Sequence, residues 1–256
     1  MILEVENLSF RYRGGRTIFH DVSFSLDKGG VLAILGANGA GKSTLLNCIA
    51  NLYRPESGSI HLDGQPMSQM TMAEVARIIG YVPQVHTPAY AYTVREFVVM
   101  GRTPYIGAFA TPSAADYRLA DEALERMGIA HLRDKVYTEI SGGERQQVTI
   151  ARVITQQPKI ILLDEPTAHL DYGNQYRVVQ MVKELSQEGY ALLMTTHNPD
   201  HAIILNGKVA ILNREGVLGI GQAADTLNAD TLSRLYGLRV KTTYDEDAQR
   251  NICVVC

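Results

Sequence analysis

A glycine-rich segment near residue 40 has the residue types and spacing that bind phosphate groups. It reads Gly36-Ala37-Asn38-Gly39-Ala40-Gly41-Lys42-Ser43-Thr44, which fits the pattern G-x-x-x-x-G-K-[ST]. Its glycines allow successive backbone N–H groups to turn toward phosphate oxygens, and the start of the following helix adds partial positive charge. We expect Lys42 to reach the β- and γ-phosphates of a bound nucleotide, and Ser43 to ligate Mg²⁺.

Two adjacent acids, Asp164 and Glu165, follow a run of aliphatic residues that predicts a buried strand at 159–163. Open α/β sheets bind ligands at the carboxyl ends of their strands, so we expect Asp164 to face the glycine-rich loop and hold Mg²⁺ through water. An acid at Glu165 can orient, or accept a proton from, the water that attacks the γ-phosphate. A turn-capping role for Asp164 is the structural alternative.

Two polar residues occupy comparable junctions. His197 follows the strand predicted at 190–195, and Gln84 follows the one predicted at 80–83. Neither residue is informative alone, because a single histidine is more often a surface or core residue than a catalytic one. Their positions at strand ends favour a catalytic role for His197, and for Gln84 a role in sensing the γ-phosphate or Mg²⁺.

A second anion-binding segment reads Ser141-Gly142-Gly143-Glu144. A serine N-cap followed by two glycines leaves backbone N–H groups open at the start of a helix. One chain already has a phosphate cradle at 36–44, so the second site makes sense if it closes on a nucleotide held by another molecule.

Tyr12 is a candidate for stacking on adenine. The structural alternative is an aromatic on the core face of a strand.

The pattern along the chain predicts an α/β fold with an antiparallel β edge and a helical subdomain inserted between core strands. Residues 1–30 alternate apolar and polar residues around a turn at Gly14-Gly15, which predicts an antiparallel hairpin, and 31–35 predicts a fully buried strand. Helices are expected at 41–51, 72–78 and 174–188, a hairpin at 209–220, and two short helices and a final hairpin after 223. We therefore expect a core at 1–84 and 159–222, a helical subdomain at 85–158 and a C-terminal extension at 223–256.

Net charge, apolar runs and cysteine content argue against several classes of function. The formal net charge of −3 gives no electrostatic reason to expect nucleic-acid binding. No apolar run approaches the ~18 residues that cross a bilayer, and the N-terminus has no export pattern, so a membrane role is expected to run through a partner. Cys48, Cys253 and Cys256 are expected to be thiols, because no further ligands complete a metal set.

At this point the whole chain resembles the ATP-binding subunits of ABC transporters. It is most similar to the importer ATPases for ferric siderophores, haem and cobalamin, a family that includes some molybdate importers. The subgroup resemblance rests on Tyr81-Val82-Pro83-Gln84, on residues 93–105, and on His197-Asn198-Pro199-Asp200-His201-Ala202.

The resemblance implies ATP hydrolysis with Mg²⁺ by two copies of the chain, which sandwich two ATP molecules. Lys42, Ser43, Gln84, Asp164, Glu165 and His197 would then act on their own chain's ATP, residues 141–144 on the partner's, and Asp171 in the coupling between the sites. The further partners implied are a polytopic permease dimer and, indirectly, an extracytoplasmic solute-binding protein, with the subunit on the cytoplasmic side of the membrane. The chain departs from the family at Ile140, His169 and Gly30, none of which is a phosphate-contacting position.

Two other classes share part of this pattern. A non-transport ABC ATPase that acts on ribosomes or DNA usually carries long coiled coils or two cassettes, which this chain lacks. A P-loop kinase or GTP switch has no use for Ser141-Gly142-Gly143.

Within the transporter interpretation, we expect residues 85–102 to form the permease socket, with Tyr90, Tyr92 and Phe97 as apolar anchors. The alternative is that these aromatics pack the core of the helical subdomain.

Overall fold

The computed structural model describes residues 1–84, 90–107, 109–213, 215–216 and 218–256. Its central element is a six-stranded sheet in the order β10-β9-β3-β8-β7-β6. The strands are β3 (Val31–Leu35), β6 (Ile79–Val82), β7 (Ile160–Asp164), β8 (Ala191–Thr196), β9 (Lys208–Leu212) and β10 (Leu218–Gln222). All neighbours pair in parallel except β9 and β10, which form the predicted hairpin.

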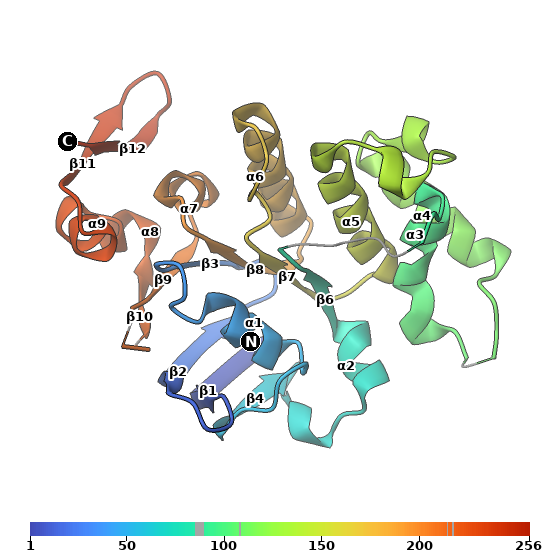
Figure 1. The fold of residues 1–256 in the computed structure, drawn as a ribbon, viewed down its shortest axis with the longest axis horizontal. Helices are drawn as coiled ribbons and strands as arrows, with labels where there is room; N and C mark the ends of the chain where they lie inside the picture. Colours follow the sequence, from blue (N-terminus) through green and yellow to red (C-terminus); the bar gives the residue numbers. More distant parts are fainter. Residues whose placement is uncertain (85–89, 108, 214, 217) are drawn as a thin grey trace.

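Helices cover both faces of this sheet, which explains why every residue of β3, β7 and β8 is buried. Helix α1 (Lys42–Ile49) lies on one side, and α6 (Tyr172–Gln187) and α7 (Pro199–Leu205) lie on the other (Figure 1). The helices predicted at 41–51 and 174–188 are thereby confirmed. Helix α7 is an addition that the sequence pattern did not predict.

A separate antiparallel sheet in the order β2-β1-β4-β5 packs beside α1 (Figure 1). The predicted N-terminal hairpin is confirmed as β1 (Leu3–Arg11) and β2 (Thr17–Leu26). Strand β1 lies inside this sheet, because β4 (Ser57–Leu62) pairs with its other side and β5 (Gln65–Pro66) follows β4. The 3₁₀ turn η1 (Met67–Gln69) and the confirmed helix α2 (Met72–Ile78) lead from this sheet into β6.

The described residues between β6 and β7 are mainly helical. They form α3 (Val94–Val99), η2 (Met100–Tyr105), α4 (Ala114–Arg126), η3 (Ala130–Leu132), η4 (Tyr137–Glu139) and α5 (Gly142–Gln156). Thr93, Ser113 and Ser141 each start a helix with a capping box, in which the side chain accepts from the backbone of an acid three residues later. Each cap fixes a helix start and pairs two backbone amide groups, that of the capping residue and that of the acid.

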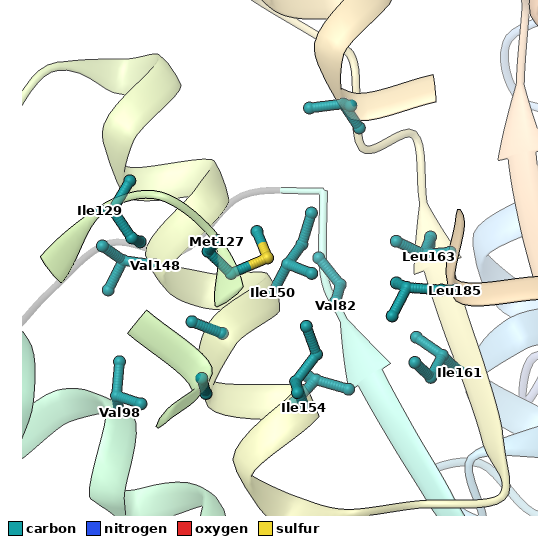
Figure 2. Packing of buried hydrophobic residues seen from close by; sticks show 14 of the residues in the cluster. Val82, Val98, Met127, Ile129, Val148, Ile150, Ile154, Ile161, Leu163 and Leu185 are labelled. Carbon is teal, nitrogen blue, oxygen red and sulfur yellow. The ribbon is translucent and has the colours of Figure 1, made fainter. Parts of the chain in front are cut away.

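Helix α5 joins the helical segment to the central sheet through one continuous apolar cluster. Figure 2 shows Ile150 and Ile154 of α5 between Val82 and Ile161 of the sheet and Val98 of α3. Movement of α5 therefore has to be transmitted to β6 and β7, since interiors packed at this density transmit strain.

The C-terminal residues pack at the end of the sheet formed by β9 and β10 (Figure 1). They form α8 (Ala223–Thr226), α9 (Ala229–Tyr236) and the hairpin of β11 (Val240–Asp245) and β12 (Arg250–Val255), as predicted. Their apolar side chains share a cluster with Leu35 of β3 and Ala202 of α7. The last part of the chain therefore contacts the strand that carries the glycine-rich loop.

One expected surface residue is buried. Phe97 is only 4% exposed and stacks on Tyr137 with ring centroids 4.1 Å apart, so its prediction as a permease anchor is wrong. The cause is helical periodicity, which turns Phe97 toward α5 together with Val94 and Val98. Tyr90 and Tyr92 are 70% and 40% exposed, and the part of the expected socket at 85–89 lies outside the described residues.

Phe97→Ala is expected to lower the free energy of unfolding by about 3–5 kcal/mol, because it leaves a cavity beside Tyr137. Tyr90→Ala is the matched control and should change it by less than about 0.5 kcal/mol. Chemical denaturation of both variants measures the difference. Equal costs would contradict the assignment of Phe97 to the core.

Candidate functional site

The residues predicted to bind phosphate and metal or to act in catalysis meet where three neighbouring strands end. Strands β3, β8 and β7 are adjacent and parallel, so their carboxyl ends lie at one edge of the sheet. The glycine-rich loop follows β3, Asp164 is the last residue of β7, and His197 follows β8. This is the edge at which α/β sheets bind their ligands.

The glycine-rich loop has positions at which only glycine fits. A Cβ at Gly36 would lie 2.6 Å from the carbonyl oxygen of Leu212, and Gly41 has a φ of +103° with no room beside Ile18. The Lys42 side chain is 5% exposed and folds back over the loop, where its Nζ donates to the Gly36 carbonyl oxygen at 2.8 Å. Asn38 and Gly39 are exposed at the tip, and Thr44 lies in the first turn of α1.

Asp164 is 3% exposed, and three hydroxyl groups donate to its carboxylate. The donors are Ser43 Oγ at 3.0 Å, Thr195 Oγ1 at 2.7 Å and Tyr81 OH at 3.4 Å. Burial, followed by the nearby Asp164 charge, raises the pKa of Tyr81 and keeps its phenol protonated. The carboxylate is therefore fixed from the loop and from both neighbouring strands, β6 and β8.

The Ser43 hydroxyl and the Asp164 carboxylate fit Mg²⁺, because both are hard oxygen ligands and they already lie within 3.0 Å of each other. In the described part of the chain no three His, Cys, Asp or Glu side chains form a metal-binding group. That suits Mg²⁺, which binds one or two protein oxygens and takes its remaining ligands from water and phosphate.

Glu165 lies at the centre of the polar cluster and is held in an uncommon backbone conformation. Its φ of +45° is in the left-handed region, which costs an ordinary residue about 1–3 kcal/mol. Its backbone N–H donates to Thr195 Oγ1 at 2.8 Å. The carboxylate pairs with Lys42 Nζ at 3.2 Å, accepts from Gln84 Nε2 at 3.4 Å and lies 3.3 Å from His197 Nδ1.

The structure therefore brings six of the predicted residues together: Lys42, Ser43, Gln84, Asp164, Glu165 and His197. Strand pairing accounts for the convergence, because it aligns Asp164 with Thr195, two residues before His197. A water held beside the Glu165 carboxylate would have a base within reach, with a cation and an imidazole next to it.

The segment at 141–144 lies at the start of α5, and its hydrogen bonds are internal. Ser141 Oγ accepts from the Glu144 N–H at 3.3 Å, and Glu144 Oε2 accepts from the Ser141 N–H at 2.8 Å. The Ser141 donors lower the pKa of Glu144. This segment contacts the start of α6 instead of the polar cluster: Asn174 lies against Gly143 and donates to both oxygens of Asp171.

Tyr12 follows β1 and is 45% exposed, so it does not pack on the core face of a strand. Phe10 occupies the core position, and the centroids of the Phe10 and Tyr12 rings lie 4.9 Å apart with the ring planes nearly perpendicular. The Tyr12 hydroxyl lies 3.2 Å from Thr44 Oγ1, beside the glycine-rich loop. The expected stacking on adenine stays a prediction.

Sequence reasoning missed a layer of hydroxyl and imidazole groups beneath the cluster. Thr195 bridges Asp164 and Glu165, and His201 Nδ1 lies 3.3 Å from Thr167 Oγ1 and 3.4 Å from Thr196 Oγ1. Burial, then the nearby His197, lowers the pKa of His201 to about 4. The available signal was a pair of threonines ending an otherwise apolar strand, since buried hydroxyls need partners.

Comparison with known proteins agrees with this geometry. Residues 19–168 match the family model described as ABC transporter. The molybdate import ATP-binding protein MolC of Haemophilus influenzae is 37% identical over 96% of this chain and 91% of its own length. The hemin import ATP-binding protein HmuV of Rhodococcus jostii is 36% identical over 88% and 76%. A solved structure of a metal-chelate type ABC transporter in an inward-facing conformation aligns with a TM-score of 0.88 and 34% identity, over 100% of this chain and 97% of that one.

The lowered pKa of His201 predicts a specific loss of stability in acid. Between about pH 6.5 and pH 4 the unfolded chain binds a proton on this histidine and the folded chain does not, so stability falls as the pH falls. His201→Asn is expected to remove about 1–2 kcal/mol of that pH dependence, measured as the difference between unfolding curves at pH 7 and pH 4.5. His131→Asn, at an exposed position, should retain it. Identical pH dependence in the wild type and His201→Asn would contradict the assignment.

Proposed function

The chain belongs to the ABC transporter family and is an ATPase of that family, and we propose that it drives solute import through a membrane permease. The cargo we propose is a metal chelate such as a ferric siderophore, haem, cobalamin or an oxyanion such as molybdate. Relatives named for molybdate and hemin import, together with the metal-chelate type structure, support this range. The alternative function, a non-transport ABC ATPase, has no comparable support.

The observation that carries the catalytic proposal is the position of the Glu165 carboxylate. One of its oxygens lies 3.2 Å from Lys42 Nζ and the other lies 3.3 Å from His197 Nδ1. In the proposed mechanism Lys42 moves onto the β- and γ-phosphates, and Glu165 orients the attacking water and accepts its proton. His197 holds Glu165 in place. Gln84 contacts the γ-phosphate, and this contact moves the helical segment that follows Gln84.

Mg²⁺ is the proposed cofactor, and the oxygens of Ser43, Asp164 and Gln84 would hold it. When bound, it neutralises charge on the phosphate oxygens. The protein residues then need only bind the nucleotide, exclude bulk water and place the attacking water.

A second copy of the chain is the proposed catalytic partner. Residues 141–144 begin α5, and a helix start of this kind can bind an anion, but the contacts of this segment are internal and to Asn174. We propose that this segment closes on ATP held by the partner's glycine-rich loop. Asp171 then couples the two sites, because Asn174 links it to Gly143.

Permease docking is proposed at the junction of the core and the helical segment. A groove of about 430 Å³ lies there between α2 and η2, with Leu52, Met72 and Met100 among its apolar lining. Tyr90 and Tyr92 are exposed on the same helical segment, and Tyr92 is anchored by its carbonyl, which accepts from the Tyr137 N–H. A short cytoplasmic permease helix is the proposed occupant, and it would receive the motion that starts at Gln84.

The proposed permease contact implies a location at the membrane and one further partner, a solute-binding protein. Within the described residues, no helix has the length and apolar character needed to cross a membrane. We propose that the chain sits on the cytoplasmic face of the inner membrane as a peripheral subunit, beneath a permease dimer that receives cargo from an extracytoplasmic solute-binding protein.

Glu165→Gln is expected to keep ATP binding and reduce kcat by about 100-fold or more, because the amide preserves shape but cannot accept the proton. Steady-state hydrolysis and equilibrium binding of labelled ATP measure the two effects. Glu125→Gln, at an exposed position of α4, is the control and should hydrolyse ATP at the wild-type rate. Near-normal turnover by Glu165→Gln would remove Glu165 from the catalytic role.

Tyr90→Asp and Tyr92→Asp are expected to leave the fold and basal ATPase intact but to abolish permease-stimulated ATPase and uptake, because a charge replaces an apolar contact. Tyr244→Asp, on the distant C-terminal hairpin, is the control and should transport normally. Stimulation is measured with permease in vesicles, and melting temperature reports the fold. Full uptake by both variants, or their unfolding, would count against the docking site.

A further inference from the structure

The C-terminal extension makes a direct hydrogen bond to the loop that carries His197. The Tyr236 hydroxyl, at the end of α9, donates to the backbone carbonyl oxygen of His197 at 2.8 Å. Thirty-nine residues separate the two groups in sequence. This contact joins a part of the chain outside the nucleotide-binding motifs to the histidine beside Glu165.

The backbone of this loop matters because the His197 side chain is weakly held. Its side chain is 57% exposed, and the contact recorded for its ring is the one to Glu165 at 3.3 Å. An exposed imidazole keeps its direction only if the backbone that carries it is fixed. The neighbouring Asn198 N–H donates to Thr196 Oγ1 at 3.0 Å, which ties the loop to the end of β8. Tyr236 adds a second attachment, from α9.

Tyr236 is itself well anchored. Its ring packs against the C-terminal apolar cluster, which includes Leu35 of β3 and Leu232 of α9. Gly237, with a φ of +67°, ends the helix directly after it. Burial raises the pKa of Tyr236, so the phenol remains a hydrogen-bond donor throughout the physiological range.

A second attachment lies one helical turn away. Asp200 in the first turn of α7 accepts from the Cys253 N–H at 3.3 Å and pairs with Arg250 at 3.5 Å. Both donors belong to β12. The C-terminal hairpin and α9 therefore hold the start of α7 and the His197 loop together.

We propose that Tyr236 is a positioning residue for ATP hydrolysis: its hydroxyl fixes the His197 carbonyl and thereby directs the imidazole at Glu165. The inference rests on the role proposed above for His197. The inference gives the C-terminal extension, residues 223–256, a role in catalysis. The sequence motifs at 36–44 and 141–144 do not predict such a role.

Tyr236→Phe tests this, because it removes the hydroxyl and keeps the packed ring. At fixed protein concentration, kcat for ATP is expected to fall about fivefold with KM unchanged, which corresponds to about 1 kcal/mol. Tyr244→Phe is the matched control. In the described part of the chain, the Tyr244 hydroxyl donates only to Gln249, within the same hairpin. This variant should keep the wild-type kcat.

Histidine NMR supplies a readout that does not depend on hydrolysis. The chain has seven histidines, and the imidazole resonances of His197, His20, His61 and His131 are each assigned by their loss in the corresponding histidine-to-alanine variant. Tyr236→Phe should shift the His197 resonance and leave those of His20, His61 and His131 in place. Wild-type hydrolysis and its loss in Glu165→Gln test the proposed function separately.

Three results would overturn the inference. The first is an unchanged kcat in Tyr236→Phe, or a change confined to KM. The second is an unmoved His197 resonance, whatever happens to kcat. The third is a shift of all the assigned histidine resonances, which would mean that the hydroxyl stabilises the whole fold instead of one loop.

Discussion

The site depends on one buried carboxylate. Asp164 is almost completely removed from solvent, and an ionised carboxylate in that position is tolerated only if hydrogen bonds replace its water. Hydroxyls from Ser43, Tyr81 and Thr195 supply them, so the glycine-rich loop, β6 and β8 must all hold their register for the charge to be satisfied. The same constraint places Glu165 next to Lys42, because Thr195 also accepts the Glu165 N–H.

The chain separates the predicted phosphate-binding loop from the second predicted anion-binding segment. The loop, the acids and His197 gather at the ends of the sheet strands, while residues 141–144 start a helix that packs on the sheet through Ile150 and Ile154. Asp171 and Asn174 bring the start of α6 against that helix start. A fold with this division suits an enzyme whose complete site forms between two molecules. We propose that movement of the 141–144 helix start relative to the cluster at the strand ends controls the rate of turnover.

Much of this was predictable from sequence because the strongest signals are local. Continuous aliphatic runs marked β3, β7 and β8, and the residues after them marked the site. Strand β4 was missed, since Ser57–Leu62 has only two buried residues, and helix α7 was missed as well. Phe97 was misassigned because periodicity shows that a face is apolar but not what covers it. Thr195, His201 and Tyr236 act through contacts between segments distant in sequence, which only tertiary structure brings together.

The central claim, that each ATP lies between the loop of one chain and the 141–144 segment of another, is tested most directly by cross-linking. A protein carrying Asn38→Cys, Ser141→Cys and Glu165→Gln, with its native cysteines replaced by serine, would be oxidised with and without ATP. The account predicts a covalent dimer that forms only with ATP and requires both introduced cysteines. A cross-link within single chains, or no ATP-dependent cross-link, would contradict it.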